Sequence, residues 1–183
     1  MKIGITGSLS SGKSSVVKIF SKNKKIIFSA DKIVKDLYAS NKFKKKLKKK
    51  INLKKKNIKE EIKSSLLKKE ISLRELGSIV HPFVRRMMKE FYKKNKNKKI
   101  ILFEIPLLIE NKLMNFFDSI ILVVAPKRVR LKRYLKNGGK KDMFSLLDKN
   151  QMPAKNKIKY CDFLIVNNKS KKLLKQKVND IIK

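Results

Sequence analysis

The stretch Gly7-Ser-Leu-Ser-Ser-Gly12-Lys13-Ser14 decides how the fold is interpreted. It matches the pattern Gly-x-x-x-x-Gly-Lys-Ser/Thr without a gap. It follows a short apolar run at Lys2–Thr6 and opens a helix-like stretch at Ser14–Phe20, which is the strand–loop–helix setting that the pattern requires. In this setting backbone N–H groups surround phosphate oxygens, and the helix N-terminus adds partial positive charge. The stretch therefore predicts a phosphate-binding loop for a nucleoside triphosphate.

Two side chains of this loop have expected roles. Lys13 is expected to bridge the β- and γ-phosphates, and the Ser14 hydroxyl is expected to bind Mg²⁺. The alternative is a chance turn rich in glycine and serine, which the match in both spacing and context disfavours. The loop indicates the phosphoryl donor but says nothing about the acceptor.

Short apolar runs alternate with helix-like segments along the rest of the chain. Within each run the hydrophobicity is continuous, which is typical of strands buried on both faces of a sheet. Five such runs are predicted strands: Lys2–Thr6, Ile26–Phe28, Ile100–Phe103, Ser119–Val124 and Phe163–Val166. The last segment, Ser170–Ile182, opens on an N-cap residue type and has one apolar helical face. This order predicts an α/β fold with a parallel sheet and right-handed helical crossovers.

The span from about residue 32 to residue 98 holds no clear strand, and its hydrophobic spacing is helical throughout. Ser72-Leu-Arg-Glu75 is a capping-box sequence that leads into apolar residues at helical spacing. Pro82 is expected to kink this run or to restart it as a new helix. A helical insertion therefore follows the second strand. A second candidate mobile segment is Arg130–Gln151, with Gly138-Gly139 as its turn.

The composition is strongly basic: 50 of the 183 residues are Lys or Arg and 14 are Asp or Glu, which gives a formal net charge of +36. Such a charge favours nucleic acid as a partner, because cations neutralise phosphates and release counterions. Only six of the 50 are arginine, however, and proteins that read bases usually rely on arginine. In the most basic stretch, Lys42–Lys56, the residues Phe43, Leu47 and Ile51 recur every four positions. A solvated lysine face on a helix is the favoured interpretation, and a functional anion-binding patch is the alternative.

The sequence also predicts where the protein resides. Cys161 is the single cysteine, which excludes a disulfide within the chain and favours a reducing compartment. The most apolar stretch, Ile100–Ile109, contains Glu104 and Pro106 and is shorter than the roughly 20 residues of a membrane span. We therefore expect a cytoplasmic protein without a membrane span.

Three further residues are candidates for phosphoryl transfer to a small molecule. Asp31 follows the second predicted strand at its C-terminal end, where open α/β sheets bind their ligands, so its carboxylate is a candidate base for an attacking hydroxyl. An N-cap for a helix from Lys32 explains Asp31 equally well. Glu104 ends the third strand beside the same crevice and is a candidate for holding a metal-bound water. His81 is the only histidine, and a lone histidine is more often structural than catalytic.

Several motifs, in this order, resemble those of the dephospho-coenzyme A kinase family, and the match runs nearly from end to end. The opening strand and the loop through Ser14 resemble the start of that family. The later motifs are Ser29-Ala-Asp31, His81-Pro82, Glu104-Ile-Pro-Leu-Leu-Ile-Glu110, Gln151-Met-Pro153 and the strand that closes on Asn167-Asn168. Each of these is weak alone, but their order and spacing together are specific.

The resemblance implies a P-loop kinase fold with a five-stranded parallel sheet flanked by helices. Residues 1–31 and 99–183 are then the nucleotide-binding core, residues 32–98 a helical coenzyme A subdomain, and residues 130–152 a lid that excludes water when it closes over ATP. The implied reaction transfers the γ-phosphoryl group of ATP to the ribose 3′-hydroxyl of dephospho-CoA with Mg²⁺ as cofactor. Specific nucleic-acid binding is not expected.

The resemblance also assigns roles to individual residues. Asp31 becomes the general base, with Lys13 as the phosphate clamp and Arg133 as the third catalytic residue. ATP binding falls to Gly7, Ser10, Ser11, Gly12, Lys13, Ser14 and Ser15, and Mg²⁺ binding falls to Ser14. Acceptor binding falls to His81, Arg85, Glu104 and Leu107.

The sequence departs from the family pattern at several positions. Ser29 replaces an aspartate, Glu104 stands where aspartate is commoner, and Ser8 and Ser10 stand where glycines are usual, which leaves the loop backbone less freedom. The lid arginine falls on Asn137, so either Arg133, Lys136 or Lys140 compensates or the enzyme is slow. Two alternative functions stay open: another P-loop kinase of nucleotides or small metabolites, and a basic nucleic-acid-binding module with a vestigial loop.

Overall fold

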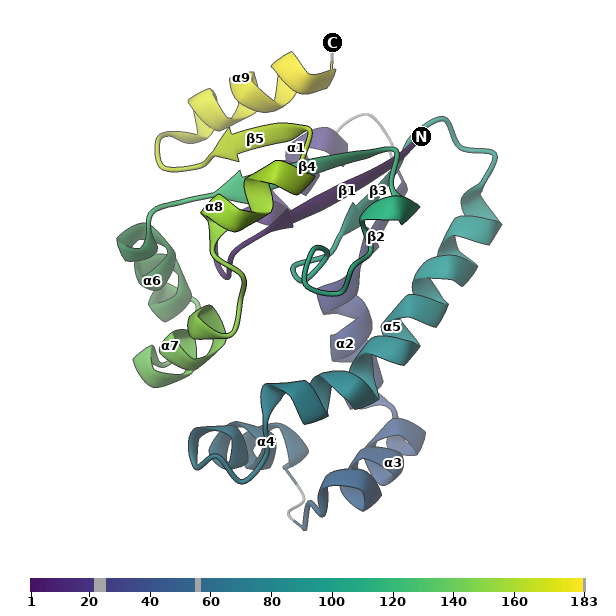
Figure 1. The fold of residues 1–183 in the computed structure, drawn as a ribbon, viewed down its shortest axis with the longest axis vertical. Coiled ribbons are helices and arrows are strands. Elements are labelled where there is room, and N and C mark those ends of the chain that lie inside the picture. Colours follow the sequence, from purple (N-terminus) through teal and green to yellow (C-terminus); the bar gives the residue numbers. More distant parts are fainter. Residues whose placement is uncertain (22–25, 55–56, 183) are drawn as a thin grey trace. The chain divides into compact units, whose positions relative to one another are not determined.

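A computed structural model describes residues 1–21, 26–54 and 57–182 (Figure 1). The chain divides into two compact units. The first comprises residues 1–29 and 94–183, and the second comprises residues 30–93. These boundaries lie within a few residues of the division expected at residues 31 and 98.

The first unit is built on a five-stranded, wholly parallel sheet with the strand order β2-β3-β1-β4-β5. The strands are β1 (Lys2–Gly7), β2 (Ile26–Ser29), β3 (Ile101–Glu104), β4 (Ser119–Val124) and β5 (Phe163–Val166). The predicted sheet is confirmed, and each predicted strand lies within one residue of an observed one. The reason is that four consecutive residues inside β4 and all of β3 are buried, so their hydrophobicity is continuous.

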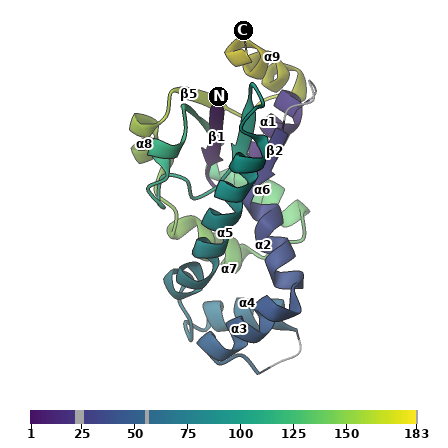
Figure 2. The same cartoon turned by 90° about the vertical axis from the view of Figure 1, so that its right-hand side faces the viewer.

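One face of the sheet packs against two helices, α1 (Lys13–Phe20) and α9 (Lys171–Ile182). Figure 2 shows α9 beside α1. Buried residues of these helices meet the strands in one core: Ile3, Ile5, Val16, Val17, Phe20, Leu102, Ile121, Val123, Ile165, Leu174 and Val178. Helix α9 begins as predicted, because Ser170 Oγ accepts a hydrogen bond from the Leu173 N–H at 3.3 Å.

The opposite face of the sheet packs against the segment that follows β3. The Phe103 ring lies 5.6 Å from that of Phe116 and 5.4 Å from that of Phe117, both measured between centroids. A Cβ atom at Gly4 would come within 2.6 Å of Leu108 Cδ1, so any larger residue there would displace the Leu108 side chain. The central strand β1 is therefore covered on both sides, which fixes the position of the loop that follows it.

The remaining helices of the first unit lie between β3 and β5. They are η2 (Met114–Phe116), α6 (Lys127–Lys136), α7 (Lys141–Lys149), α8 (Ala154–Lys157) and η3 (Ile158–Tyr160). The predicted turn at Gly138-Gly139 separates α6 from α7, and Gly138 has a positive φ of 78°. The predicted lid segment is thus two short helices joined by a glycine turn.

The second unit is helical, as predicted. It contains α2 (Ala30–Ala39), α3 (Asn41–Ile51), α4 (Ile58–Leu67) and most of α5 (Leu73–Asn95). In α3 the Phe43 and Leu47 side chains are buried, and the Phe43 ring meets that of Phe83 edge-on at 5.2 Å. Six of the eight lysines at positions 42–54 are exposed, as a solvated helix face requires, and Lys55 and Lys56 lie outside the described residues.

Helix α5 begins with the predicted capping box. The Glu75 N–H donates to Ser72 Oγ at 3.1 Å, and the Ser72 N–H donates to Glu75 Oε2 at 2.8 Å. Of the two alternatives expected at Pro82, the restart as a new helix is wrong, since α5 continues through that residue, and the kink stays a prediction. Buried side chains on both sides of the proline, including Ile79, Val80 and Met88, hold the helix together at a cost of about 3 kcal/mol for an internal proline.

Candidate functional site

The candidate functional residues of the first unit gather at the carboxyl ends of the parallel strands. The phosphate-binding loop (residues 7–14) follows β1, Glu104 ends β3, and Asn167 follows β5. This edge is where open α/β sheets bind their ligands. The fold therefore brings together residues as far apart in the sequence as Ser11 and Asn167, which are separated by 156 positions.

The backbone of the phosphate-binding loop makes two left-handed turns. Gly12 has a φ of 97°, which only glycine adopts without strain, and α1 begins at the next residue. Ser10 has a φ of 56° although it carries a Cβ atom, which costs about 1–2 kcal/mol. Ser10, at a position where glycine is usual, therefore keeps the left-handed turn but leaves its backbone strained.

Lys13 lies inside the loop that precedes it. Its Nζ atom donates to the carbonyl oxygens of Gly7 and Ser8, both at 3.1 Å, and the residue is 7% exposed. The ammonium group is thus held where the loop backbone curves around a phosphate. Ser11 is buried beside it, whereas Ser14 and Ser15 are exposed on the first turn of α1.

Glu104 connects α1 with the end of β2. Ser14 Oγ donates to Glu104 Oε1 at 2.6 Å, and Ser29 Oγ donates to Glu104 Oε2 at 3.1 Å. Glu104 is 5% exposed, so its carboxylate has left most of its water. A hydroxyl and a carboxylate are the hard oxygen ligands that Mg²⁺ accepts, and Mg²⁺ usually takes one or two carboxylates together with substrate phosphates. The donor set at Ser14 and Glu104 fits this ion without a larger acidic cluster, and the described residues contain no group of three acids, histidines or cysteines able to hold a metal.

Two arginines of α6 contact the phosphate-binding loop. The Arg133 guanidinium donates to the carbonyl oxygens of Ser11 at 3.2 Å and Asn167 at 3.0 Å. Arg130, which the sequence did not single out, donates to the Leu9 carbonyl at 3.4 Å and pairs with Asp148. The lid segment is thus joined to the loop by its own cations.

The end of the lid segment reaches the same loop. Gln151 Oε1 accepts a hydrogen bond from the Leu9 N–H at 2.8 Å. Lys136, Asn137 and Lys140 are exposed. Compensation by one of these lysines for the arginine replaced at Asn137 stays a prediction.

The segment after β3 is fixed by a buried ion pair. Lys157 Nζ lies 2.7 Å from Glu110 Oε1, and Lys157 is fully buried. Glu110 also accepts a hydrogen bond from the Met152 N–H at 3.1 Å. Leu107 is half-buried in this segment, and its carbonyl accepts a hydrogen bond from Asn111 Nδ2 at 2.8 Å. The motif from Glu104 to Glu110 therefore connects β3 with the end of the lid segment through an ion pair and a hydrogen bond at Glu110.

Asp31 belongs to the second unit and is exposed in the first turn of α2. This helix begins at Ala30 rather than at Lys32, so Asp31 does not precede it and the N-cap explanation is wrong. A carboxylate in the first turn is still favoured by the helix dipole. Asp31 follows Ser29 by two residues, and Ser29 is the residue that bonds Glu104.

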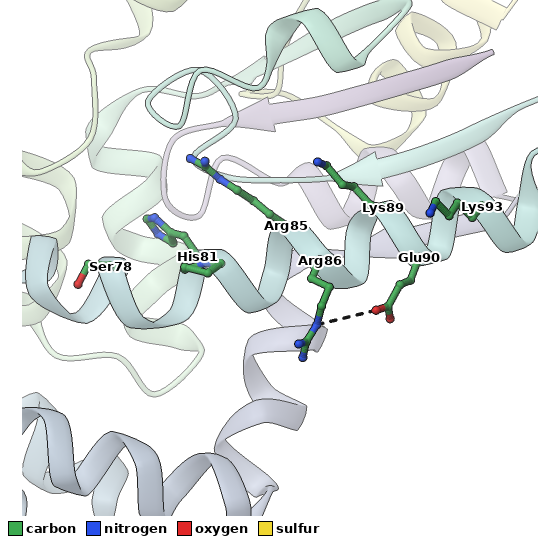
Figure 3. A pocket seen from close by; sticks show the side chains of 9 residues that line it. Ser78, His81, Arg85, Arg86, Lys89, Glu90 and Lys93 are labelled. Atoms are coloured by element: carbon green, nitrogen blue, oxygen red, sulfur yellow. Dashed lines mark ion pairs between the residues drawn. The ribbon is translucent and has the colours of Figure 1, made fainter.

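The other acceptor-binding candidates of the second unit lie on α5 around a hollow of about 660 Å³. His81, Arg85 and Lys89 follow one another at four-residue spacing, and Figure 3 shows all three on one side of the helix. The Arg86 guanidinium points elsewhere, toward Glu90, from which it is separated by 3.8 Å. The hollow thus combines one imidazole with four cationic side chains, those of Arg85, Arg86, Lys89 and Lys93, and with the carboxylate of Glu90.

The surroundings of His81 in this hollow favour its neutral form. Burial lowers the pKa of the imidazole below 6.5, and the nearby charge of Arg85 lowers it further. A Cβ atom at Gly77 would lie 2.9 Å from His81 Cε1, so the glycine one turn earlier provides the space that the ring occupies. A neutral imidazole can both donate and accept a hydrogen bond.

Asn167 is a candidate functional residue to which the sequence analysis gave no role. It is 6% exposed, and its Nδ2 atom donates to the Ser11 carbonyl at 2.8 Å. The motif Asn167-Asn168 marks the position, but nothing in the local sequence indicates a contact with a loop near the other end of the chain.

No helix within the described part of the chain has the length and apolar character needed to cross a membrane.

Comparisons of sequence agree on one family. A model of that family, described as dephospho-CoA kinase, matches residues 1–172. The dephospho-CoA kinase of Fusobacterium nucleatum is 32% identical over 184 residues, which cover 97% of this chain and 95% of that protein. The dephospho-CoA kinase of Bartonella quintana is 32% identical over 188 residues, which cover 98% and 95% respectively.

Comparisons of structure agree on the fold. A protein of Thermus thermophilus superposes with a TM-score of 0.80 at 23% identity, over 100% of this chain and 95% of that one. The dephospho-CoA kinase of Campylobacter jejuni gives a TM-score of 0.65 at 25% identity, over 100% and 96%. A shikimate kinase of Acinetobacter baumannii gives 0.58 at 12% identity, over 99% and 92%, and shows the shared fold alone.

Proposed function

The chain belongs to the dephospho-CoA kinase family, and on this premise we propose that it transfers the γ-phosphoryl group of ATP to the ribose 3′-hydroxyl of dephospho-CoA, giving coenzyme A and ADP. In this reaction the acceptor oxygen loses its proton and forms a bond to the γ-phosphorus. The bond from that phosphorus to the β-γ bridging oxygen breaks, and ADP leaves with the electron pair. The cytoplasmic location expected from the sequence stays a prediction.

The observation that carries this proposal is the group of contacts at the strand ends. Lys13 lies within the phosphate-binding loop, and Ser14 Oγ lies 2.6 Å from the buried carboxylate of Glu104. A polyphosphate in the loop would meet the Lys13 ammonium in place of the carbonyl groups of Gly7 and Ser8. Little covalent chemistry is required of the protein, because phosphoryl transfer depends on positioning and charge stabilisation.

Mg²⁺ is the cofactor that the Ser14 and Glu104 oxygens would hold. When bound, it would supply positive charge to the oxygens of the β- and γ-phosphates. Glu104 is already oriented by its two serine hydrogen bonds, so its carboxylate would bind or support the ion with little reorganisation.

Asp31 is the base in this proposal. Two Cα–Cα steps of about 3.8 Å separate it from Ser29, so it lies at most about 7.6 Å along the chain from a residue bonded to Glu104. Its position in an exposed first turn leaves the carboxylate accessible to an acceptor hydroxyl. The helix dipole also favours the ionised carboxylate that a base requires.

The acceptor binds along α5 in this proposal. Dephospho-CoA carries a pyrophosphate, and the cations of Arg85 and Lys89 line the same hollow as the neutral imidazole of His81. An arginine fork suits a phosphate group, and a neutral imidazole suits a hydroxyl or an amide. Arg133 would act from the lid segment, where its guanidinium already lies against the loop.

A competition assay tests the proposal. Purified protein is given Mg²⁺ and ATP with dephospho-CoA, adenosine or a nucleoside monophosphate as acceptor, and ADP release is followed. We expect turnover with dephospho-CoA and a product phosphorylated at the 3′-hydroxyl, identified by mass spectrometry and phosphorus NMR.

The controls decide between the open alternatives. Preferred turnover with a nucleoside monophosphate would assign the chain to another kinase activity. If no acceptor is phosphorylated while RNA binds with a steep dependence on salt, the nucleic-acid-binding alternative holds instead.

A further inference from the structure

The asparagine that follows β5 is held against the phosphate-binding loop by its side chain and against the end of β4 by its backbone. Its Nδ2 atom donates to the Ser11 carbonyl at 2.8 Å, and its backbone N–H donates to the Val124 carbonyl at 2.8 Å. The amide is buried, so water does not compete for these bonds. Asn167 therefore holds one fixed orientation beside the loop.

A second donor holds the same carbonyl. Arg133 Nη1 donates to the Ser11 oxygen at 3.2 Å, while its Nη2 donates to the carbonyl of Asn167 itself at 3.0 Å. The side-chain amide of Asn167 also packs directly against Gly12, the residue that follows Ser11. The contact is so close that a Cβ atom at Gly12 would lie 2.0 Å from Asn167 Nδ2. The peptide group between Ser11 and Gly12 is thus fixed on one side by two donors and by steric contact.

The geometry of that peptide group determines the direction in which the Gly12 N–H points. None of the peptide bonds in the described residues is cis, and the N–H of a trans peptide points opposite to its C=O. Since the Ser11 carbonyl is held toward Asn167 and Arg133, the Gly12 N–H is directed away from them. In a loop of this pattern that N–H is among those that surround the phosphate oxygens.

We infer that Asn167 is a positioning residue for phosphate binding: it fixes the Ser11–Gly12 peptide so that the Gly12 N–H faces the polyphosphate of ATP. This inference rests on the proposed function, because it requires a polyphosphate in the loop. It makes the last strand of the sheet a component of the nucleotide site, through a residue that touches the loop and not the ligand.

The test compares two neighbouring asparagines. Asn167→Asp keeps the shape of the side chain but replaces the donor with an oxygen that repels the Ser11 carbonyl. Asn168→Asp makes the same change of charge at the next position, where the side chain is exposed. Binding of ADP and of inorganic tripolyphosphate is measured by calorimetry in about 0.3 M salt, which suppresses nonspecific attraction to the basic surface. We expect Asn167→Asp to weaken both ligands about 10- to 100-fold and Asn168→Asp to leave both nearly unchanged.

Two results would overturn the inference. Equal affinities in the two variants would show that the Ser11 contact does not matter for phosphates. A loss for ADP without a loss for tripolyphosphate would place Asn167 at the base of the nucleotide rather than behind the loop. If Asn167→Asp does not fold by circular dichroism, Asn167→Ala against Asn168→Ala decides by the same measurement, with a smaller loss expected.

Lys13→Ala separates this inference from the proposed function. Tripolyphosphate binding that does not respond to Lys13→Ala would mean that the loop binds no phosphate, and both claims would fail. Binding that responds to Lys13→Ala but not to Asn167→Asp or Asn167→Ala would overturn the role of Asn167 alone.

Discussion

The phosphate-binding loop and the hollow on α5 both carry candidate functional residues, but they hold them in different ways. Around the loop, contacts join residues that are far apart in sequence, such as Ser14 with Glu104 and Ser11 with Asn167. On α5, His81 and Arg85 come from one helix at four-residue spacing. The first region is organised by tertiary hydrogen bonds and the second by helix geometry.

This difference indicates which step of the reaction each region controls. Buried, mutually bonded groups such as Glu104 are set before the substrate arrives, which is what stabilisation of a transition state requires. Cations along an open helix face can attract and hold a flexible anionic acceptor without such preorganisation. We therefore expect changes near the loop to lower kcat or nucleotide affinity, and changes on α5 to raise KM for the acceptor.

Asp31 is the sharpest test of the division between residues that act on kcat and residues that act on KM. It lies in the first turn of α2, in the helical unit, but the proposed function gives it a role in the transfer step. Asp31→Asn removes the base while keeping the size of the side chain. We expect kcat to fall about 10²- to 10⁴-fold with KM for dephospho-CoA little changed. Steady-state ADP release with both substrates varied measures the two constants separately.

Asp36→Asn is the matched control for this change. Asp36 is exposed on the same helix, and its replacement alters the net charge equally. A kcat that stays high in Asp31→Asn would remove Asp31 from catalysis. Equal losses in both variants would assign the effect to charge rather than to proton transfer.

The titration of His81 tests the proposed surroundings of the hollow on α5, and the expected effect is smaller than that of Asp31→Asn. Because it is the only histidine, its imidazole protons give a single NMR titration. We expect a midpoint below 6.5, since burial and then Arg85 lower the pKa, and a higher midpoint in Arg85→Gln. A midpoint at or above 6.5 in the wild-type protein would contradict the lowering of the pKa by the half-buried position of the ring.

The same pKa predicts how stability depends on pH. The unfolded chain binds a proton at His81 near pH 6.5, whereas the folded chain binds it only at lower pH. Below pH 6.5 the unfolded state therefore holds more protons, and the free energy of unfolding decreases as the pH falls toward the folded pKa. Urea unfolding at two pH values should show a smaller decrease in His81→Gln.

Local sequence patterns predicted most of the fold. The run Ser119–Val124 is apolar from its second residue onward, as expected of a strand buried on both faces, and the bounds of β4 were predicted to the residue. The loop from Gly7 to Ser14 was found because its glycines, lysine and serine must occur at fixed spacing. Helix α5 began where Ser72 and Glu75 form their reciprocal hydrogen bonds.

Other features depend on contacts that no local pattern contains. The roles of Asn167 and Arg130 follow from hydrogen bonds to a loop more than 120 positions away. The continuation of α5 through Pro82 depends on burial on both sides of the proline, which outweighs its local cost. Asp31 was placed at a helix start, but only the structure shows that the helix begins before it.

The central claim is that the loop binds the donor and α5 binds the acceptor. Calorimetric titration of ADP and of dephospho-CoA into Lys13→Ala and Arg85→Ala tests it most directly. Arg74→Ala is the control, because Arg74 is exposed on the same helix and does not line the hollow. We expect Lys13→Ala to weaken ADP and Arg85→Ala to weaken dephospho-CoA, each about 10- to 100-fold, while the other ligand keeps its affinity. Loss of ADP binding in Arg85→Ala, or unchanged dephospho-CoA binding there, would contradict the claim.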